Sequence, residues 1–145
     1  MVERVVDGDG LRLADGRQVR LLQIDAPELK DDCYGRDALR ELLALAPQGT
    51  RVALVGDPGL DDRDDYGRLL RYVLVDGRNL NIELVARGAA SPYYFRGDRG
   101  RHAAALDDAA EAARAAGRGY WGACPLARLE PGRGSVTGPA SSRRR

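Results

Sequence analysis

Turns that contain glycine divide the first 24 residues into three short apolar segments. This regular spacing of turns limits the possible folds more than any other feature of the sequence. The segments lie at residues 2–6, 11–13 and 19–24, with Asp-Gly pairs between them. An Asp-Gly pair between apolar strands is a strong signal for a β-hairpin, because these residues tolerate the positive φ of a tight turn. The sequence therefore predicts a meander of three strands.

The spacing of apolar residues predicts two more strands and three helices. The strands are expected at 51–55 and 69–75, and the helices at 36–45, 79–87 and 102–116. A glycine follows each helical pattern within a few residues, as is typical of helix ends. Strands and helices do not alternate regularly, which favours a small α+β barrel over a doubly wound sheet. A five-stranded OB-type barrel is one architecture of this size.

Charge is unevenly distributed, although the 145 residues have a formal net charge of only +1. Residues 126–145 contain five Arg and one Glu, a net charge of +4, which leaves −3 for residues 1–125. We interpret 1–125 as the folded domain. Residues 126–145 are rich in Pro, Gly, Ser and Arg without periodicity, and we interpret them as a disordered tail. Because residues 1–125 are slightly acidic, the domain has no overall positive field that would attract nucleic acid. The net charge therefore does not indicate a binding partner.

Composition excludes several classes of protein. No apolar run approaches the roughly 20 residues of a membrane-spanning helix, so no membrane partner is expected. The segment MVERVVDGDG lacks the basic and apolar regions of a signal peptide. With two cysteines, one histidine and no CxxC pair, a Cys/His zinc site is not expected. No obligate protein partner is evident, and we expect a monomer.

Three loops carry charged residues in a combination that suits phosphodiester cleavage: Asp9 in DGDG, Asp25 and Glu28 in DAPE, and Arg68 in DDYGR, with Arg20 on the strand before DAPE. Each alone has an ordinary explanation as a turn or a strand exit. Together, carboxylates on loops can hold a hard cation such as Ca²⁺, and another carboxylate can position or deprotonate water. The two arginines can bind phosphate oxygens and stabilise the developing charge. Without a candidate His or Cys nucleophile, direct attack by water is favoured.

The order of these motifs resembles that of the staphylococcal nuclease (thermonuclease) family. DGDG is followed by RLLQIDAPE, DYGRLLRYVLVDGRNLNIELVARG, an aromatic loop, an Ala-rich helix and GYWGAC, from about Val5 to Cys124. The resemblance implies an α+β, mainly β fold, a five-stranded OB-type barrel with three helices. It also implies Ca²⁺-dependent hydrolysis of DNA and RNA with little sequence preference.

The resemblance implies a metal site at three positions. Asp9 and Asp25 match the metal-binding aspartates, and Ala26 stands where a backbone carbonyl also contacts the metal. A metal requirement is expected on charge grounds as well. The three carboxylates and two arginines of the predicted site sum to −1 without a cation, and this charge would repel a phosphodiester.

The resemblance also supplies catalytic residues. Glu28 matches the carboxylate proposed to act as general base, and Arg20 and Arg68 match the two phosphate-binding arginines. The alternative is a catalytically inactive OB-type module that binds nucleic acid or protein, because a fold alone does not imply an activity. An intact Glu28 favours the enzyme.

Aromatic residues are expected to contact the substrate. Tyr66 matches a tyrosine beside the substrate phosphate, and Tyr94 matches an aromatic residue that stacks near a base. Stacking of this kind tolerates any base. A position in the core between the last two helices is equally compatible with Tyr94, and is preferred for Tyr93 and Phe95.

The two cysteines, Cys33 and Cys124, resemble cysteines of secreted family members. A disulfide between them is plausible on that resemblance. If formed, it favours a secreted protein, although the location stays open.

Overall fold

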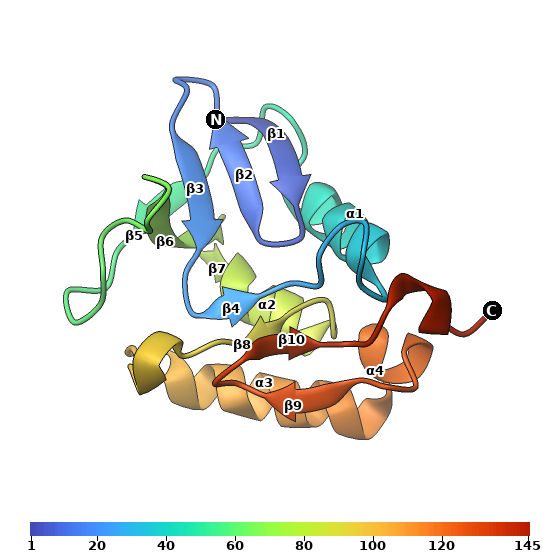
Figure 1. Cartoon of the computed structure of the whole chain (residues 1–145). Helices are drawn as coiled ribbons and strands as arrows, with labels where there is room; N and C mark the ends of the chain where they lie inside the picture. The colour runs from blue at the N-terminus through green and yellow to red at the C-terminus, as the bar shows by residue number, and fades with distance from the viewer.

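A twisted sheet built from the first half of the chain forms the upper part of the molecule, as the computed structural model of residues 1–145 shows (Figure 1). Its main path runs β1-β2-β3-β6-β5, and β7 pairs with β6. All neighbours are antiparallel except β3 and β6, which are parallel. The strands are β1 (Val2–Asp7), β2 (Gly10–Leu13), β3 (Gln18–Leu21), β5 (Ala53–Val55), β6 (Leu69–Val75) and β7 (Arg78–Asn79). The five predicted strands are thus present, and the α+β, OB-type fold class is confirmed, with β1 and β5 at the two open edges of the path.

Two tight connections bring distant parts of the first 25 residues together. The β1–β2 turn places Asp7 opposite Gly10, and on the other side of β2 Gly10 lies opposite Arg20. Beyond β3 the chain turns at Leu22 and Gln23, whose φ is 65°. It then enters the short strand β4 (Ile24–Asp25), which pairs with β8 (Ser91–Pro92).

The helices pack below and beside the sheet, as Figure 1 shows. The three predicted helices are confirmed, and a short fourth one follows them: α1 (Gly35–Leu45), α2 (Leu80–Ala86), α3 (Ala103–Ala116) and α4 (Tyr120–Ala123), with 3-10 turns η1 (Phe95–Gly97) and η2 (Ala140–Ser142). The side chain of Asn79 accepts the Ile82 N–H at 3.1 Å and caps α2. None of the helices combines the length and apolar character needed to cross a membrane.

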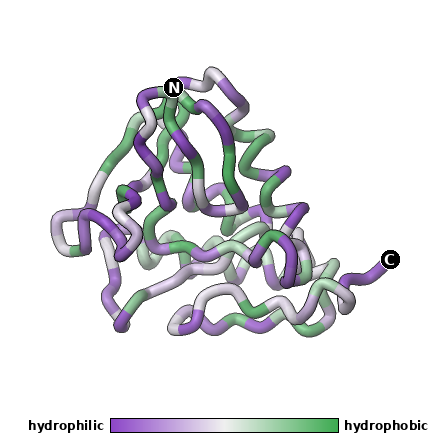
Figure 2. The backbone as a smooth tube through the Cα atoms, turned by 45° about the horizontal axis from the view of Figure 1, so that its top comes forward, coloured by the Kyte–Doolittle hydropathy of each residue, from purple (hydrophilic) through white to green (hydrophobic).

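The main core lies between the sheet and the first three helices. Strand residues such as Leu11 and Val73 and helix residues such as Leu84 and Leu106 belong to one buried apolar cluster. In Figure 2 apolar and hydrophilic stretches alternate along the chain, and the C-terminal end is hydrophilic. Asn81 is a fully buried polar residue next to this core: it accepts the Val73 N–H at 3.0 Å and donates to the Leu22 carbonyl at 2.8 Å. These bonds satisfy the buried amide. Because one side chain contacts both Val73 of β6 and Leu22, it also links the turn after β3 to β6.

The prediction that residues 126–145 are disordered is wrong. They begin with an antiparallel hairpin of β9 (Arg128–Glu130) and β10 (Gly134–Val136), and β10 contacts β4 and β8 (Figure 1). The remainder follows the loop that precedes α1, where Gly138 O accepts the Cys33 N–H and Asp31 O accepts the Ala140 N–H, both at 2.9 Å. Composition misled the prediction because this segment is ordered by backbone hydrogen bonds to the domain and not by an apolar core of its own.

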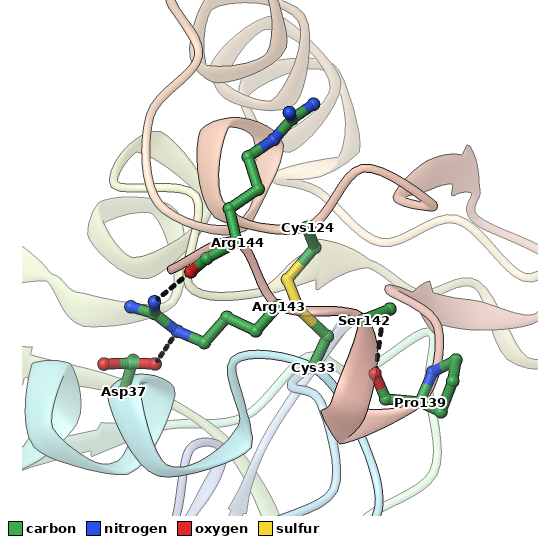
Figure 3. Close-up of a disulfide and its surroundings, with 7 residues drawn as sticks. All are labelled: Cys33, Asp37, Cys124, Pro139, Ser142, Arg143 and Arg144. Carbon is green, nitrogen blue, oxygen red and sulfur yellow. Dashed lines mark hydrogen bonds and ion pairs between the residues drawn. A yellow bond between two sulfur atoms is a disulfide. The ribbon is translucent and has the colours of Figure 1, made fainter.

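A disulfide joins Cys33 to Cys124, which confirms the expected pairing. Both cysteines are buried and pack with Tyr120 in a small cluster separate from the main core. Figure 3 shows Arg143 beside this bond, where its Nε donates to Asp37 of α1 at 2.9 Å. The disulfide therefore ties the start of α1 to α4 at the point where the C-terminal segment also attaches.

Removing the disulfide should destabilise the protein strongly. The bond closes a loop with a sequence separation of 91 residues, and the loss of that constraint on the unfolded chain costs about 4–5 kcal/mol. Urea unfolding should show this decrease in the Cys33→Ser/Cys124→Ser double variant relative to the oxidised protein. Reductant should destabilise the wild type similarly and leave the double variant unchanged. Equal stability of the oxidised protein and the double variant would contradict this role.

Candidate active site

Arg20 lies between two aspartates. Its Nη2 is 3.3 Å from Asp9 Oδ2 and 3.1 Å from Asp25 Oδ1, and its Nη1 donates to the carbonyls of Leu21 and Ile24 at 3.0 and 2.8 Å. In a regular strand Arg20 and Asp25 would point to opposite faces, so the sequence requires Asp25 to lie beyond a turn. The turn between β3 and β4 provides that reversal. The structure thus brings together three of the predicted site residues.

Asp9 is the most deeply placed carboxylate of this group, with 7% of its surface exposed. Its Oδ2 also accepts the N–H of Ala26 at 2.8 Å, so the backbone of Ala26 lies against this carboxylate. Burial raises the pKa of Asp9 to about 7, and the nearby Arg20 offsets only part of that effect. The ionised carboxylate is therefore incompletely compensated by the protein.

The aspartate pair fits a hard cation. Carboxylate oxygens are the ligands that Ca²⁺ and Mg²⁺ prefer, and a positively charged group, the Arg20 guanidinium, already lies between Asp9 and Asp25. No group of three or more His, Cys, Asp or Glu converges anywhere in the chain. A cation here would thus be held by two carboxylates, with its other ligands from backbone oxygens, water or substrate.

A cavity of about 380 Å³ opens beside this cluster. Arg20 and Asp25 belong to its lining, together with residues of the acidic loop that precedes β6 and of the aromatic segment after β8. The lining is rich in both charge signs and in aromatic rings, and includes Arg63, Arg68, Arg133, Asp61, Asp64, Asp65, Tyr66, Tyr93 and Phe95. Such a surface can contact phosphates and bases together.

Arg68 extends into this cavity from a well-defined position. Asp64 Oδ2 accepts from its Nε at 2.7 Å, and Asp64 Oδ1 accepts its backbone N–H at 2.9 Å. Burial disfavours the ionised Asp64, but these bonds outweigh burial and hold its pKa below the ordinary value. Both Nη groups of Arg68 lack a protein partner, so they are available to a phosphate. Tyr66, 87% exposed, lies beside the guanidinium.

The structure places Tyr94 in the core, one of the two positions left open for it, and places Tyr93 and Phe95 at the cavity. Tyr94, predicted to stack on a base, is only 6% exposed, and its hydroxyl donates to Asp107 at 2.6 Å. Burial and that carboxylate raise its pKa. Tyr93 and Phe95, predicted to lie in the core, line the cavity. Tyr93 and Tyr94 follow the short strand β8, where neighbouring side chains point to opposite sides, and the chain then enters η1 at Phe95.

Glu28 lies outside the cavity lining. Its backbone N–H donates to Asp32 at 2.9 Å, whereas its exposed side chain makes no hydrogen bond or ion pair. Glu28 is thus three residues beyond Asp25 on the loop to α1, with a free carboxylate. The structure does not group it with Asp9 and Asp25, and its role as general base stays a prediction.

Sequence reasoning missed the contribution of the C-terminal hairpin. Arg133 lines the cavity, and Ser135 donates to Asp25 through both its backbone N–H and its hydroxyl. A signal for this hairpin was present, because Pro131-Gly132-Arg133 separates two short segments with β-compatible residues. The Arg-rich composition around it concealed that pattern.

Comparison with known protein families gives a match over most of the chain. The family model described as "Staphylococcal nuclease homologue" matches residues 18–123, which include Arg20, Asp25 and Arg68. Asp9 and the hairpin with Arg133 and Ser135 lie outside the matched residues.

Similar proteins include several whose names denote endonucleases. Over 101 residues the chain is 39% identical to Endonuclease YncB of Bacillus subtilis, covering 64% of this chain and 47% of that protein. It is 40% identical over 101 residues to the SPbeta prophage-derived endonuclease YokF of the same organism, covering 64% and 33%. It is 41% identical over 99 residues to an uncharacterized endonuclease of Escherichia coli, covering 63% and 59%. The matches thus span less than two thirds of each relative.

Replacement of Asp9 by Asn should stabilise the metal-free protein, and more so at high pH. The pKa of Asp9 in the folded chain, about 7, lies above its ordinary value of 3.8, so between these values the folded state holds a proton that the unfolded chain has lost. The contribution of Asp9 to stability therefore falls as the pH rises through this window. Urea unfolding in EDTA should give a larger gain for Asp9→Asn at pH 8 than at pH 5.

Asp108→Asn is the matched control, because Asp108 is exposed on α3 and forms no ion pair or side-chain hydrogen bond. Its effect should be small at both pH values. A gain for Asp9→Asn that is the same at pH 5 and pH 8 would show that the buried charge is not the cause.

Proposed function

Since the chain belongs to the staphylococcal nuclease family, we propose that it is a nuclease that hydrolyses phosphodiester bonds of DNA and RNA with little sequence preference and requires Ca²⁺. The observation that carries this proposal is the cluster of Asp9, Arg20 and Asp25 at a cavity that Arg68 also lines. The endonuclease names of similar proteins support the reaction class.

The cavity suits a nucleic-acid strand by its chemistry. The free Nη groups of Arg68 offer the fork geometry that binds two phosphate oxygens. Tyr93 and Phe95 offer rings for stacking, and every base has a face that can stack. Recognition through phosphates and ring faces does not read base edges, which agrees with low sequence preference.

The metal requirement follows from local charge. Asp9 and Asp25 together carry one more charge than Arg20 neutralises, and burial makes the uncompensated charge costly at Asp9. We assign Ca²⁺ to these two aspartates. When bound, it supplies positive charge that stabilises the phosphate during attack.

Residues of the chain activate the attacking water and stabilise the charge on the phosphate. In the proposed reaction, Glu28 accepts a proton from the water that attacks phosphorus, and its unpaired carboxylate is suited to this role. The bond from phosphorus to the leaving ester oxygen breaks as the new bond to the water oxygen forms, and the leaving oxygen takes a proton from solvent. Arg68 stabilises the negative charge that accumulates on the phosphate oxygens.

We also propose that the chain works as a monomer in an oxidising compartment. The buried Cys33–Cys124 disulfide supports this location, since such bonds persist outside the reducing cytosol. No obligate protein partner is part of the proposal.

Cleavage assays with plasmid DNA and RNA test the reaction and its metal requirement. Both substrates should be degraded with Ca²⁺, and EGTA should abolish degradation. Glu28→Gln should lower the rate by about 100-fold or more because it removes the proposed proton acceptor. Glu111→Gln, an exposed change on α3, is the control.

Two outcomes would contradict the proposal. Equal cleavage with and without EGTA would exclude the metal requirement. Binding of nucleic acid by the wild type without cleavage would identify an inactive binding module.

Arg68→Ala should lower the cleavage rate by about 100-fold or more, as is typical when a group that stabilises transition-state charge is removed. Arg68→Lys should recover only part of the rate, because an ammonium cannot bind two oxygens in a fork. Arg114→Ala, on the exposed face of α3, provides a matched loss of charge. Single-turnover cleavage and unfolding midpoints should be measured for all three variants. Wild-type cleavage by Arg68→Ala would refute the assignment.

A further inference from the structure

The hairpin β9–β10 contacts the proposed cation site directly. The backbone N–H and the hydroxyl of Ser135 both donate to Oδ2 of Asp25, at 2.7 and 2.9 Å. The other oxygen, Oδ1, accepts from Arg20 at 3.1 Å, and Arg20 also contacts Asp9. One oxygen of Asp25 thus faces the hairpin, and the other faces the Arg20 Nη2 that also contacts Asp9.

The close approach of β10 depends on a glycine. Gly134 has a φ of +96°, and a Cβ at this residue would overlap the carboxylate of Asp25. The hairpin is also held at its turn, because the Pro131 carbonyl accepts the Tyr94 N–H at 3.0 Å. The contact between Ser135 and Asp25 is therefore part of the packed structure of the hairpin.

We propose that Ser135 is a positioning residue for Asp25 and that the C-terminal hairpin completes the cation site. Two neutral donors on Oδ2 fix the rotation of the carboxylate so that Oδ1 lies on the side of Arg20, which also contacts Asp9. They add no positive charge that would compete with a cation. The inference rests on the cation site proposed above for Asp9 and Asp25.

The geometry distinguishes this role from an inhibitory one. A hairpin that blocked the site would occupy Oδ1, the oxygen on the side of Arg20 and the proposed cation. Here both donors of Ser135 meet Oδ2, and Oδ1 keeps its direction toward Arg20. Partners that orient a metal ligand in this way typically contribute about 10- to 100-fold to metal affinity.

Calorimetric titration of the full chain with Ca²⁺, without nucleic acid, tests the inference. Ser135→Ala removes the hydroxyl but keeps the N–H, so we expect Ca²⁺ affinity to fall about 10-fold. Ser135→Thr retains a hydroxyl and should recover most of this affinity. Ser141→Ala is the matched control, because Ser141 is exposed and its side chain forms no hydrogen bond. Unfolding in EDTA should confirm that each variant is folded.

The outcomes separate this inference from the proposed function. Unchanged or tighter Ca²⁺ binding by folded Ser135→Ala overturns the positioning role alone, provided that Asp25→Asn abolishes binding. Failure of the wild type to bind Ca²⁺ overturns both the cation site and the role of Ser135. A 10-fold loss in Ser135→Ala with recovery in Ser135→Thr supports both.

Discussion

The ion pairs of Arg20 with Asp9 and Asp25 are the interaction on which the rest of the site depends. They require Arg20 to lie opposite Gly10 on β2, so that the turn containing Asp9 meets its guanidinium. They also require the chain to reverse after β3, because Asp25 approaches Arg20 from β4. Register, turn and strand pairing thus converge on one guanidinium. A one-residue slip of β3 would move Arg20 to the opposite face of the sheet.

The cavity shows why bulk charge was a poor guide to the partner. The chain as a whole carries +1, and its first 125 residues are acidic. The acidic residues at the site form ion pairs with its arginines, however: Asp64 pairs with Arg68, and Asp9 and Asp25 pair with Arg20. Local pairing therefore leaves arginine groups directed into a cavity that total charge would describe as unfavourable for phosphate.

Much of the fold and part of the site were predictable because they depend on local patterns. Asp-Gly turns gave the meander, and apolar spacing gave α1, α2 and α3. The cluster of Asp9, Arg20 and Asp25 was predictable from motif order, because the turns that join them are short. Such patterns specify contacts between residues that are close in the sequence. The site also includes contacts between residues that are far apart in the sequence, such as that of Asp25 with Ser135.

The failures share one physical cause, which is that long-range contacts decide them. The direction of Tyr94 depends on the phase of alternation after β8 and on its partner Asp107. The order of residues 126–145 depends on backbone pairing with the loop before α1. Neither contact leaves a periodic trace in the sequence.

The disulfide changes how far apart the two halves of the proposed cation site are along the covalent structure. Asp25 and Ser135 are separated by 110 residues in sequence. Asp25 lies shortly before Cys33 and Ser135 shortly after Cys124, so the path through the sulfur bridge spans only roughly 20 residues. Because the entropy of loop closure grows with the logarithm of length, this shortcut lowers its cost by about 1.5 kcal/mol. In the oxidised chain the contact that orients Asp25 is a nearly local one, and reduction turns it into a long-range contact.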